Sequence, residues 1–252
     1  MANDDDLKLV RLFAARRDRL YEKLSGGLDL RGARLSDVDL VNADLSSADF
    51  AGADLYRVRL NHATLDGASF EGARLQFVRF EGSDLSGANF SDATFIGVDF
   101  SGCCFSGSNL TNANLAEVLN LKHGEFYEAT LAGLNLSGRD LEGTNLEGAD
   151  LSDCDLSRAN LRGANLDEAA LKGADLTDAD LTGASLQGTN LSGADLSDAI
   201  LREADLYLAN FTGVKFESTK FDGAKVLKTV FDADMAPRIQ ALIDHDVVKG
   251  YL

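Results

Sequence analysis

The sequence predicts an all-β solenoid, in which short strands wind around one apolar core. Three observations support this: a large apolar residue recurs at every fifth position, a small residue lies two positions before it, and valine recurs at every twentieth position in the first half. Repetition of this density sets the architecture before local propensity does. A helix would carry a five-residue period all round its surface, and a flat sheet would need an uninterrupted period of two.

The period of five is nearly unbroken. Every fifth residue from Leu30 to Leu115 is Leu or Phe, and so is every fifth residue from Leu121 to Phe231 except Val226. We call these residues the centres. Most have Ala two positions earlier, so a large and a small side chain point to the same side, as in a strand. Glycine often lies two positions after the centre, where a corner would turn the chain.

The small positions give the circumference of the solenoid. Valine occupies every fourth small position in the first half, at Val38, Val58, Val78 and Val98. Phenylalanine centres repeat at the same spacing at Phe50, Phe70 and Phe90. Because this spacing corresponds to four repeats, we expect a four-sided coil. At roughly 20 residues per coil, the repeats would form about ten coils at the spacing of neighbouring strands.

The repeated unit, Ala followed by Asp or Asn, a centre and two further residues, resembles the pentapeptide-repeat family. Typical copies are Ala43-Asp44-Leu45, Ala53-Asp54-Leu55, Ala88-Asn89-Phe90, Ala164-Asn165-Leu166 and Ala194-Asp195-Leu196. The resemblance covers residues 28–231 and implies a right-handed four-sided β-helix. The family members that this sequence resembles bind DNA gyrase or topoisomerase IV and protect it from quinolones or other gyrase poisons.

The segments outside the repeats are predicted to be helical. Residues 1–27 carry an amphipathic pattern that ends at Ser25-Gly26-Gly27, which is typical of a helix that caps an exposed strand edge. Residues 232–252 hold Pro237, followed at helical spacing by Ile239, Leu242, Ile243 and Val247. This second helix either caps the other end or pairs in a homodimer. In gyrase-targeting members of the family, a C-terminal helical module mediates dimerisation.

The period breaks once, within residues 116–120, because the centre after Leu115 is Leu121, one position later than the period requires. Counting the insertion, Leu119 would continue the valine column and Arg139 would be its next member. An Arg directed into a narrow apolar core is unfavourable unless it is paired or turned outward. The break is either a bulge or kink between two coaxial segments, or a place where the solenoid bends to match a partner.

Composition excludes several classes of protein. The chain has 41 acidic and 24 basic residues, and its net charge of −17 disfavours direct binding to a phosphate backbone. Three cysteines, an odd number, indicate reduced thiols rather than a disulfide framework. The acidic start lacks the basic region of an export signal, and no apolar run approaches the ~20 residues of a membrane helix. We therefore expect a cytoplasmic protein with no membrane contact.

No motif for catalysis, a cofactor or a metal is apparent. The three histidines lack a nucleophile or a metal-ligand partner at repeat spacing, and no phosphate-binding G-x-x-x-x-G-K-[ST] string occurs. Cys103 and Cys154 take small inward positions, whereas Cys104 points outward without a nearby histidine to activate it. We therefore expect no enzyme activity and look for the function on the surface.

The first candidate site is an acidic stripe. Asp residues recur at every twentieth position on one face, and the stripe consists of Asp155, Asp175, Asp178, Asp195 and Asp198. Stacked carboxylates repel one another, and Asn would serve the repeat as well, so these residues predict a function. That function is imitation of DNA in the basic groove of a DNA-processing enzyme, with DNA gyrase or topoisomerase IV as the candidate partner.

The second candidate site is an aromatic/Arg patch in the first half of the chain. It consists of Tyr56, Arg57, Arg59, Arg74, Phe77, Arg79 and Ile96. Aromatic residues interleaved with Arg are favoured at protein interfaces, although single exposed apolar residues are ordinary surface. The alternative function is therefore a general protein-protein interaction scaffold with no gyrase role.

Overall fold

The computed structural model describes residues 3–15, 27–115, 117–121 and 124–233. The chain divides into two compact units, Met1–Thr130 and Leu131–Leu252, and the division falls inside the predicted repeat segment. The predicted C-terminal helix, with Ile239, Leu242, Ile243 and Val247, lies outside the described residues.

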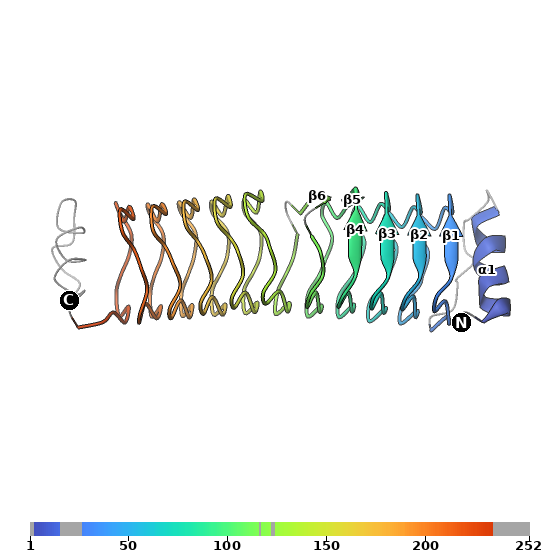
Figure 1. Cartoon of the computed structure of the whole chain (residues 1–252), viewed down its shortest axis with the longest axis horizontal. Helices are drawn as coiled ribbons and strands as arrows, with labels where there is room; N and C mark the ends of the chain where they lie inside the picture. Colours follow the sequence, from blue (N-terminus) through green and yellow to red (C-terminus); the bar gives the residue numbers. More distant parts are fainter. Residues whose placement is uncertain (1–2, 16–26, 116, 122–123, 234–252) are drawn as a thin grey trace. The chain divides into compact units, whose positions relative to one another are not determined.

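The first unit is a stack of coils. It contains α1 (Asp4–Ala15) and the strands β1 (Arg34–Ser36), β2 (Asp54–Tyr56), β3 (Arg74–Gln76), β4 (Thr94–Ile96), β5 (Val98–Asp99) and β6 (Val118–Asn120). β1 to β4 pair in parallel in chain order and lie side by side in Figure 1. Leu35 is paired with Leu55, and Leu55 with Leu75. This register confirms the four-repeat coil predicted from the valine column.

The second unit has the same register. Parallel bridges join equivalent positions of successive coils, as from Asp155 to Asp175 and from Asp175 to Asp195. The backbone N–H of Leu156 donates to the carbonyl oxygen of Asp175 at 2.7 Å, and equivalent bonds join the following coils. The second unit is therefore also a repeat solenoid, with four repeats in each coil.

The core of each unit consists of the centres and the small residues. Centres such as Leu60 and Leu176 are fully buried, as are small residues such as Ala68 and Ala179. Identical side chains stack from coil to coil, and the rings of Phe50, Phe70 and Phe90 lie parallel with centroids 4.8 Å apart. The predicted alternation of large and small inward side chains is thus confirmed.

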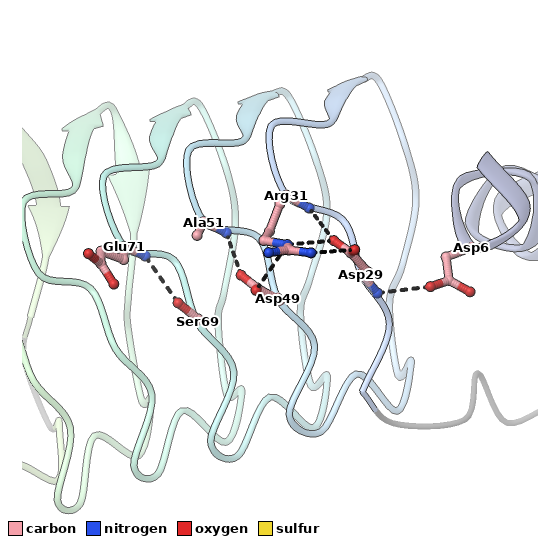
Figure 2. Close-up of polar contacts among 7 residues, drawn as sticks. All are labelled: Asp6, Asp29, Arg31, Asp49, Ala51, Ser69 and Glu71. Atoms are coloured by element: carbon pink, nitrogen blue, oxygen red, sulfur yellow. Dashed lines mark hydrogen bonds and ion pairs between the residues drawn. The ribbon is translucent and has the colours of Figure 1, made fainter. Parts of the chain in front are cut away.

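The polar residue before a centre closes the following corner. Its side chain accepts a hydrogen bond from the backbone N–H two positions later, in the manner of an Asx turn. Figure 2 shows this bond in three successive coils, between Asp29 and Arg31, Asp49 and Ala51, and Ser69 and Glu71. The requirement for a side-chain acceptor explains why Asp, Asn, Ser and Thr precede most centres.

The residue two positions after a centre has a positive φ. Glycine adopts this left-handed conformation without strain, as at Gly97 (φ 60°), whereas a side chain with a Cβ is strained there. Among the described residues, Phe77 (φ 55°) and Leu208 (φ 60°) are the bulky apolar side chains at such corners. Each is 50% exposed, so neither is held there by burial.

The helix α1 contacts the first coil. The N–H of Asp29 donates to Oδ2 of Asp6 at 2.9 Å (Figure 2). The carbonyl oxygen of Asp29 accepts from the N–H of Asn3 at 2.9 Å. One coil later, the N–H of Asp49 donates to the carbonyl oxygen of Leu28 at 2.8 Å. Asp6 therefore occupies the place that a coil carbonyl takes elsewhere, and Val10 of α1 is fully buried.

The break in the period is a β-bulge in the first unit. Val98 pairs with Val118 at the regular spacing, but Asp99 pairs with Asn120, one position further along the chain than the regular spacing gives. Because Val118 is the buried partner of Val98, it continues the valine column. The expectation that Leu119 would do so is wrong, because Leu119 is the extra residue of the bulge.

Arg139 occupies a small position of the second unit without lying in the apolar core. Its backbone N–H donates to the carbonyl oxygen of Leu136 at 3.1 Å, and its carbonyl oxygen accepts from the N–H of Asn160 at 2.8 Å. The residue is nevertheless only partly buried. The cost of burying a charge among the centres is therefore avoided.

We expect the substitution Leu176→Ala to lower the free energy of unfolding by about 2–5 kcal/mol, because truncating a buried side chain leaves a cavity in the stack. Leu176 is fully buried, whereas Leu208 is 50% exposed. The control Leu208→Ala should change the stability by less than about 0.5 kcal/mol. Urea unfolding followed by circular dichroism measures both, and equal effects would contradict this core.

The three thiols should differ in reactivity. Burial raises the pKa of Cys103 to about 12 and that of Cys154 to about 11, whereas Cys104 is half-exposed. Because the thiolate is the reactive form, Ellman's reagent at neutral pH should modify Cys104 in the native protein and all three thiols after unfolding. The variant Cys104→Ser should lose the native reaction, and a fast native reaction that persists in it would contradict the burial of the other two.

Candidate functional site

The structure brings four residues of the aromatic/Arg patch into one pocket. The pocket lies at the corner that follows β2 and β3 in the first unit and has a volume of about 860 Å³. Its lining consists of Arg57, Arg59, Phe77, Arg79, Glu81, Gly97 and Asp99. We call it the Phe77 pocket. Tyr56 adjoins it through Phe77, whereas Arg74 on β3 and Ile96 on β4 lie outside the lining.

An aromatic cluster forms one side of the Phe77 pocket. The rings of Tyr56 and Phe77 meet edge to face, with centroids 6.0 Å apart and an interplanar angle of 84°. The guanidinium of Arg57 lies 4.9 Å from the centroid of Tyr56, in a cation-π contact. A Cβ on residue 97 would lie 2.8 Å from the ring of Phe77. Gly97 therefore lets the ring lie across the next corner.

The cations of the Phe77 pocket differ in their partners. Arg59 pairs with Asp39, with Nη1 3.3 Å from Oδ2. No carboxylate in the described parts of the chain forms an ion pair with Arg57 or Arg79. Two guanidinium groups at the edge of the pocket are thus available to an outside anion.

The two acids of the Phe77 pocket already accept hydrogen bonds. Glu81 accepts from Nδ2 of Asn61 at 3.2 Å, and Asp99 accepts from the N–H of Ser101 at 3.0 Å. Asp99 closes its corner as Asp49 does. These contacts give both carboxylates a role within the repeat.

The acidic stripe lies on the second unit. Asp155, Asp175 and Asp195 form one column, because each is bridged to the next. Oδ1 of Asp175 accepts from both the N–H and the hydroxyl of Thr177, at 2.9 and 2.5 Å, and Ser157 and Ser197 bind the other two in the same way. One carboxylate oxygen therefore serves the corner. Asp178 and Asp198 sit at positive-φ corners, with φ of 59° and 60°.

The acidic stripe is partly neutralised. Nζ of Lys215 lies 3.2 Å from Oδ2 of Asp195, and Nε of Arg158 lies 3.9 Å from Oδ2 of Asp178. Hydrogen bonds from Ser197 and Lys215 hold the pKa of Asp195 below its usual range. Among the described residues, no cation forms an ion pair with the stripe's other members, Asp155, Asp175 and Asp198.

Asparagine in the same repeat position makes a contact that aspartate cannot. Nδ2 of Asn165 donates to Oδ1 of Asn145 at 3.3 Å, and Nδ2 of Asn210 donates to Oδ1 of Asn190 at 3.2 Å. These bonds join successive coils, and the same Asn residues also close their corners. An ionised carboxylate has no proton to donate, so the side chains in a column of Asp cannot form hydrogen bonds with one another between coils.

Sequence reasoning missed Glu81, Gly97 and Asp99 of the pocket and the ion pairs of Lys215 and Arg158. The coil-to-coil columns contain the signal for two of the pocket residues. Gly97 follows Phe77 in its corner column, and Asp99 follows Arg79 in the next column. The ion pairs depend on side-chain rotamers, for which the period carries no signal.

Neither a metal cluster nor a membrane span occurs in the described part of the chain. These residues contain no group of three or more His, Cys, Asp or Glu side chains placed to hold a metal ion. None of their helices is both long and apolar enough to span a bilayer.

Comparison with known proteins gave one family. The family described as pentapeptide repeats matches overlapping segments that together cover residues 27–112 and 125–225. A search of curated protein sequences found no match.

Several solved structures are similar. HetL, a pentapeptide repeat protein involved in heterocyst differentiation regulation from the cyanobacterium Nostoc sp. strain PCC 7120, is 30% identical with a TM-score of 0.69, over 92% of this chain and 98% of HetL. QnrB1, a plasmid-mediated fluoroquinolone resistance protein, is 17% identical with a TM-score of 0.40, over 88% of this chain and 95% of that chain. Rfr23, a pentapeptide repeat protein from the cyanobacterium Cyanothece 51142, is 34% identical with a TM-score of 0.25, over 46% of this chain and 65% of that chain.

The family match spans most of the chain, and the likeness to HetL extends over nearly all of both chains. The repeat register and the buried centres are the structural counterpart of that match. The chain therefore belongs to the pentapeptide-repeat family.

Proposed function

We propose that this protein is a non-catalytic binding protein whose acidic stripe mimics DNA and occupies the DNA-binding groove of DNA gyrase or topoisomerase IV. One observation carries the proposal: Asp155 and Asp175 use one carboxylate oxygen to close the corner and have no cation partner in the described residues. Asn would close the same corner and add a bond between coils. The fold therefore gives no reason for the charge, and a partner's basic groove does.

The charge density of the second unit supports the proposal. Residues 131–233 contain 18 acidic and 9 basic side chains, a net charge of −9. About five coils at the spacing of neighbouring strands extend over roughly 25 Å. Duplex DNA carries about 15 charges over that length, so the unit has roughly 60% of its charge density. A groove that holds DNA by its phosphates would attract such a surface.

HetL supports a role in binding more generally. That protein is involved in heterocyst differentiation regulation, a role that a protein can fill by binding without catalysing a reaction. Solenoids also present extended surfaces on which partners bind.

A second candidate function is a general protein-protein interaction scaffold with no gyrase role. The observation that favours it is the Phe77 pocket, where the exposed ring of Phe77 lies beside two guanidinium groups without ion pairs in the described residues. Aromatic and Arg side chains carry much of the binding energy of protein interfaces.

We also propose that the protein is cytoplasmic, that α1 caps the first coil, and that residues 232–252 form a helix that caps the other end or pairs in a homodimer. Sedimentation velocity of the full chain and of an Ile243→Asp variant tests the pairing. A monomer at high concentration would contradict it.

The purified protein should compete with a labelled DNA duplex for DNA gyrase or topoisomerase IV and lower the rate of supercoiling or decatenation at micromolar concentration. The expected cause is occupation of the basic groove by the acidic stripe. Fluorescence anisotropy and gel assays measure the two effects, and higher salt should weaken both. The absence of any effect on either enzyme would contradict the DNA-mimic proposal.

The triple variant Asp155→Asn, Asp175→Asn and Asp195→Asn should keep its stability within about 1 kcal/mol, because Asn preserves the corner bond. It should weaken binding to the enzyme at least about tenfold, or about 1.4 kcal/mol. Thermal unfolding and the anisotropy assay measure the two quantities.

The matched control is Asp44→Asn, Asp49→Asn and Asp84→Asn in the first unit. It removes the same charge at the same repeat position, since each of these residues also precedes a centre. It should leave the affinity unchanged. An equal loss in both triple variants would mean that only net charge matters and that the stripe is not the site.

A further inference from the structure

We propose that the Phe77 pocket binds a short acidic segment of a partner protein, in which an aromatic or large aliphatic side chain stands next to a carboxylate. The inference deepens the scaffold function proposed above and rests on it. It requires neither the acidic stripe nor gyrase, because the pocket lies on the first unit and the stripe on the second.

Phe77 is an exposed aromatic residue at a corner of the coil. Its φ of 55° is unfavourable for a side chain with a Cβ, and the residue is 50% exposed. The next residue in the same column, Gly97, adopts this conformation without strain. Glycine at position 77 would therefore relieve the strain and remove an exposed apolar ring. Other residues share this φ, Leu208 among them, so the feature that distinguishes Phe77 is an exposed ring that the fold does not need and that packs against Tyr56 and Gly97. Such a ring points to a function.

The ring of Phe77 is held in place by its neighbours. The ring of Tyr56 contacts the ring of Phe77 edge to face. Because Gly97 has no side chain, the ring of Phe77 can lie against the corner at Gly97. Arg57 in turn packs on Tyr56. A ring that is fixed before binding loses little conformational entropy when a partner side chain packs on it. The pocket therefore offers a rigid aromatic anchor point rather than a flexible patch.

The cations of the Phe77 pocket complement an acidic partner. Arg57 and Arg79 line the pocket beside Phe77, and neither forms an ion pair with the described residues. A planar guanidinium group can bind a carboxylate through two parallel hydrogen bonds. A partner carboxylate next to the anchoring side chain would therefore find a cation in the lining of the same pocket.

The same lining disfavours a polyanion. Glu81 and Asp99 are also in the pocket, and the whole chain carries a net charge of −17. Nucleic acid would bring many phosphates against these carboxylates, whereas a short peptide brings one or two charges. A volume of about 860 Å³ accommodates one large side chain and its neighbours, within the range of ordinary ligand pockets. An acidic peptide with an apolar anchor is the occupant that satisfies all of these constraints.

The test uses the full chain and four synthetic blocked pentapeptides. The first has a central tryptophan flanked by two glutamates. The others replace the glutamates by glutamines, the glutamates by lysines, or the tryptophan by alanine. Proton-nitrogen NMR spectra record shifts at and around residues 56–59, 77–81 and 97–99 at millimolar peptide. The glutamate-tryptophan peptide should shift these signals, and each replacement should weaken its binding several-fold.

The variant Phe77→Gly distinguishes a loss of peptide binding from a loss of folding. It should unfold at the same temperature as the parent chain or higher, and bind the glutamate-tryptophan peptide at least about tenfold more weakly, as expected on loss of an anchoring side chain. The matched control is Leu208→Gly, which removes an equally exposed apolar side chain from an equivalent corner of the second unit. It should leave peptide binding unchanged. Arg79→Gln should weaken the glutamate peptide but not the glutamine peptide.

Three outcomes would overturn the proposal. They are no shifts at the pocket with the glutamate-tryptophan peptide, equal or stronger binding of the lysine peptide, and unchanged binding by Phe77→Gly. The gyrase assay separates this result from the DNA-mimic function. Phe77→Gly should compete with DNA as the parent chain does, and the Asp155, Asp175 and Asp195 triple variant should still bind the peptide, so either proposal can fail alone.

Discussion

The hydrogen bonds between successive coils determine where every described side chain of the repeats points. The N–H of Leu60 donates to the carbonyl oxygen of Arg79, and the N–H of Arg59 donates to that of Val38. Such bonds fix the register of each coil relative to the next. In this register each centre stacks on a centre and each small residue stacks on a small residue. A slip by one residue would turn inward side chains to the surface. The bulge at Leu119 accommodates the one extra residue, so the coil after it keeps its buried centres.

The same register divides each repeat into residues that the fold needs and residues that it leaves free. The centre and the small residue fill the core, and the residue before the centre closes the corner. The remaining positions face outward, where substitution costs little stability. Function in such a protein is therefore expected where a free position departs from what the corner or the column favours. Phe77, an exposed aromatic ring at a corner that Gly or a polar residue occupies in most coils, is a departure of this kind. The Asp column on the second unit lies at the corner-closing position instead, and there only the charge is left unexplained by the fold.

Each departure lies in a column, so neighbouring coils bring together residues that are far apart in the sequence. Phe77 lies across Gly97, and Arg59 is bridged to Arg79. The stacking that stabilises the core thus also assembles surface sites from short, separate segments. In the acidic stripe, the stacking of coils brings carboxylates together, and these like charges repel one another. The ion pair of Lys215 with Asp195 offsets this repulsion at one end of the column.

The sequence by itself determined the four-repeat coil, the inward residues and the columns, because a strict period leaves one arrangement that buries all the centres. It also located most residues of the Phe77 pocket, since columns follow from the period. The tertiary structure decided which residue of the break is extra, because Val118 and Leu119 are both apolar and only the pairing of Val98 distinguishes them. It also decided which charges are paired and which aromatic rings meet. Those contacts depend on rotamers and on packing across coils, which the period of the sequence does not encode.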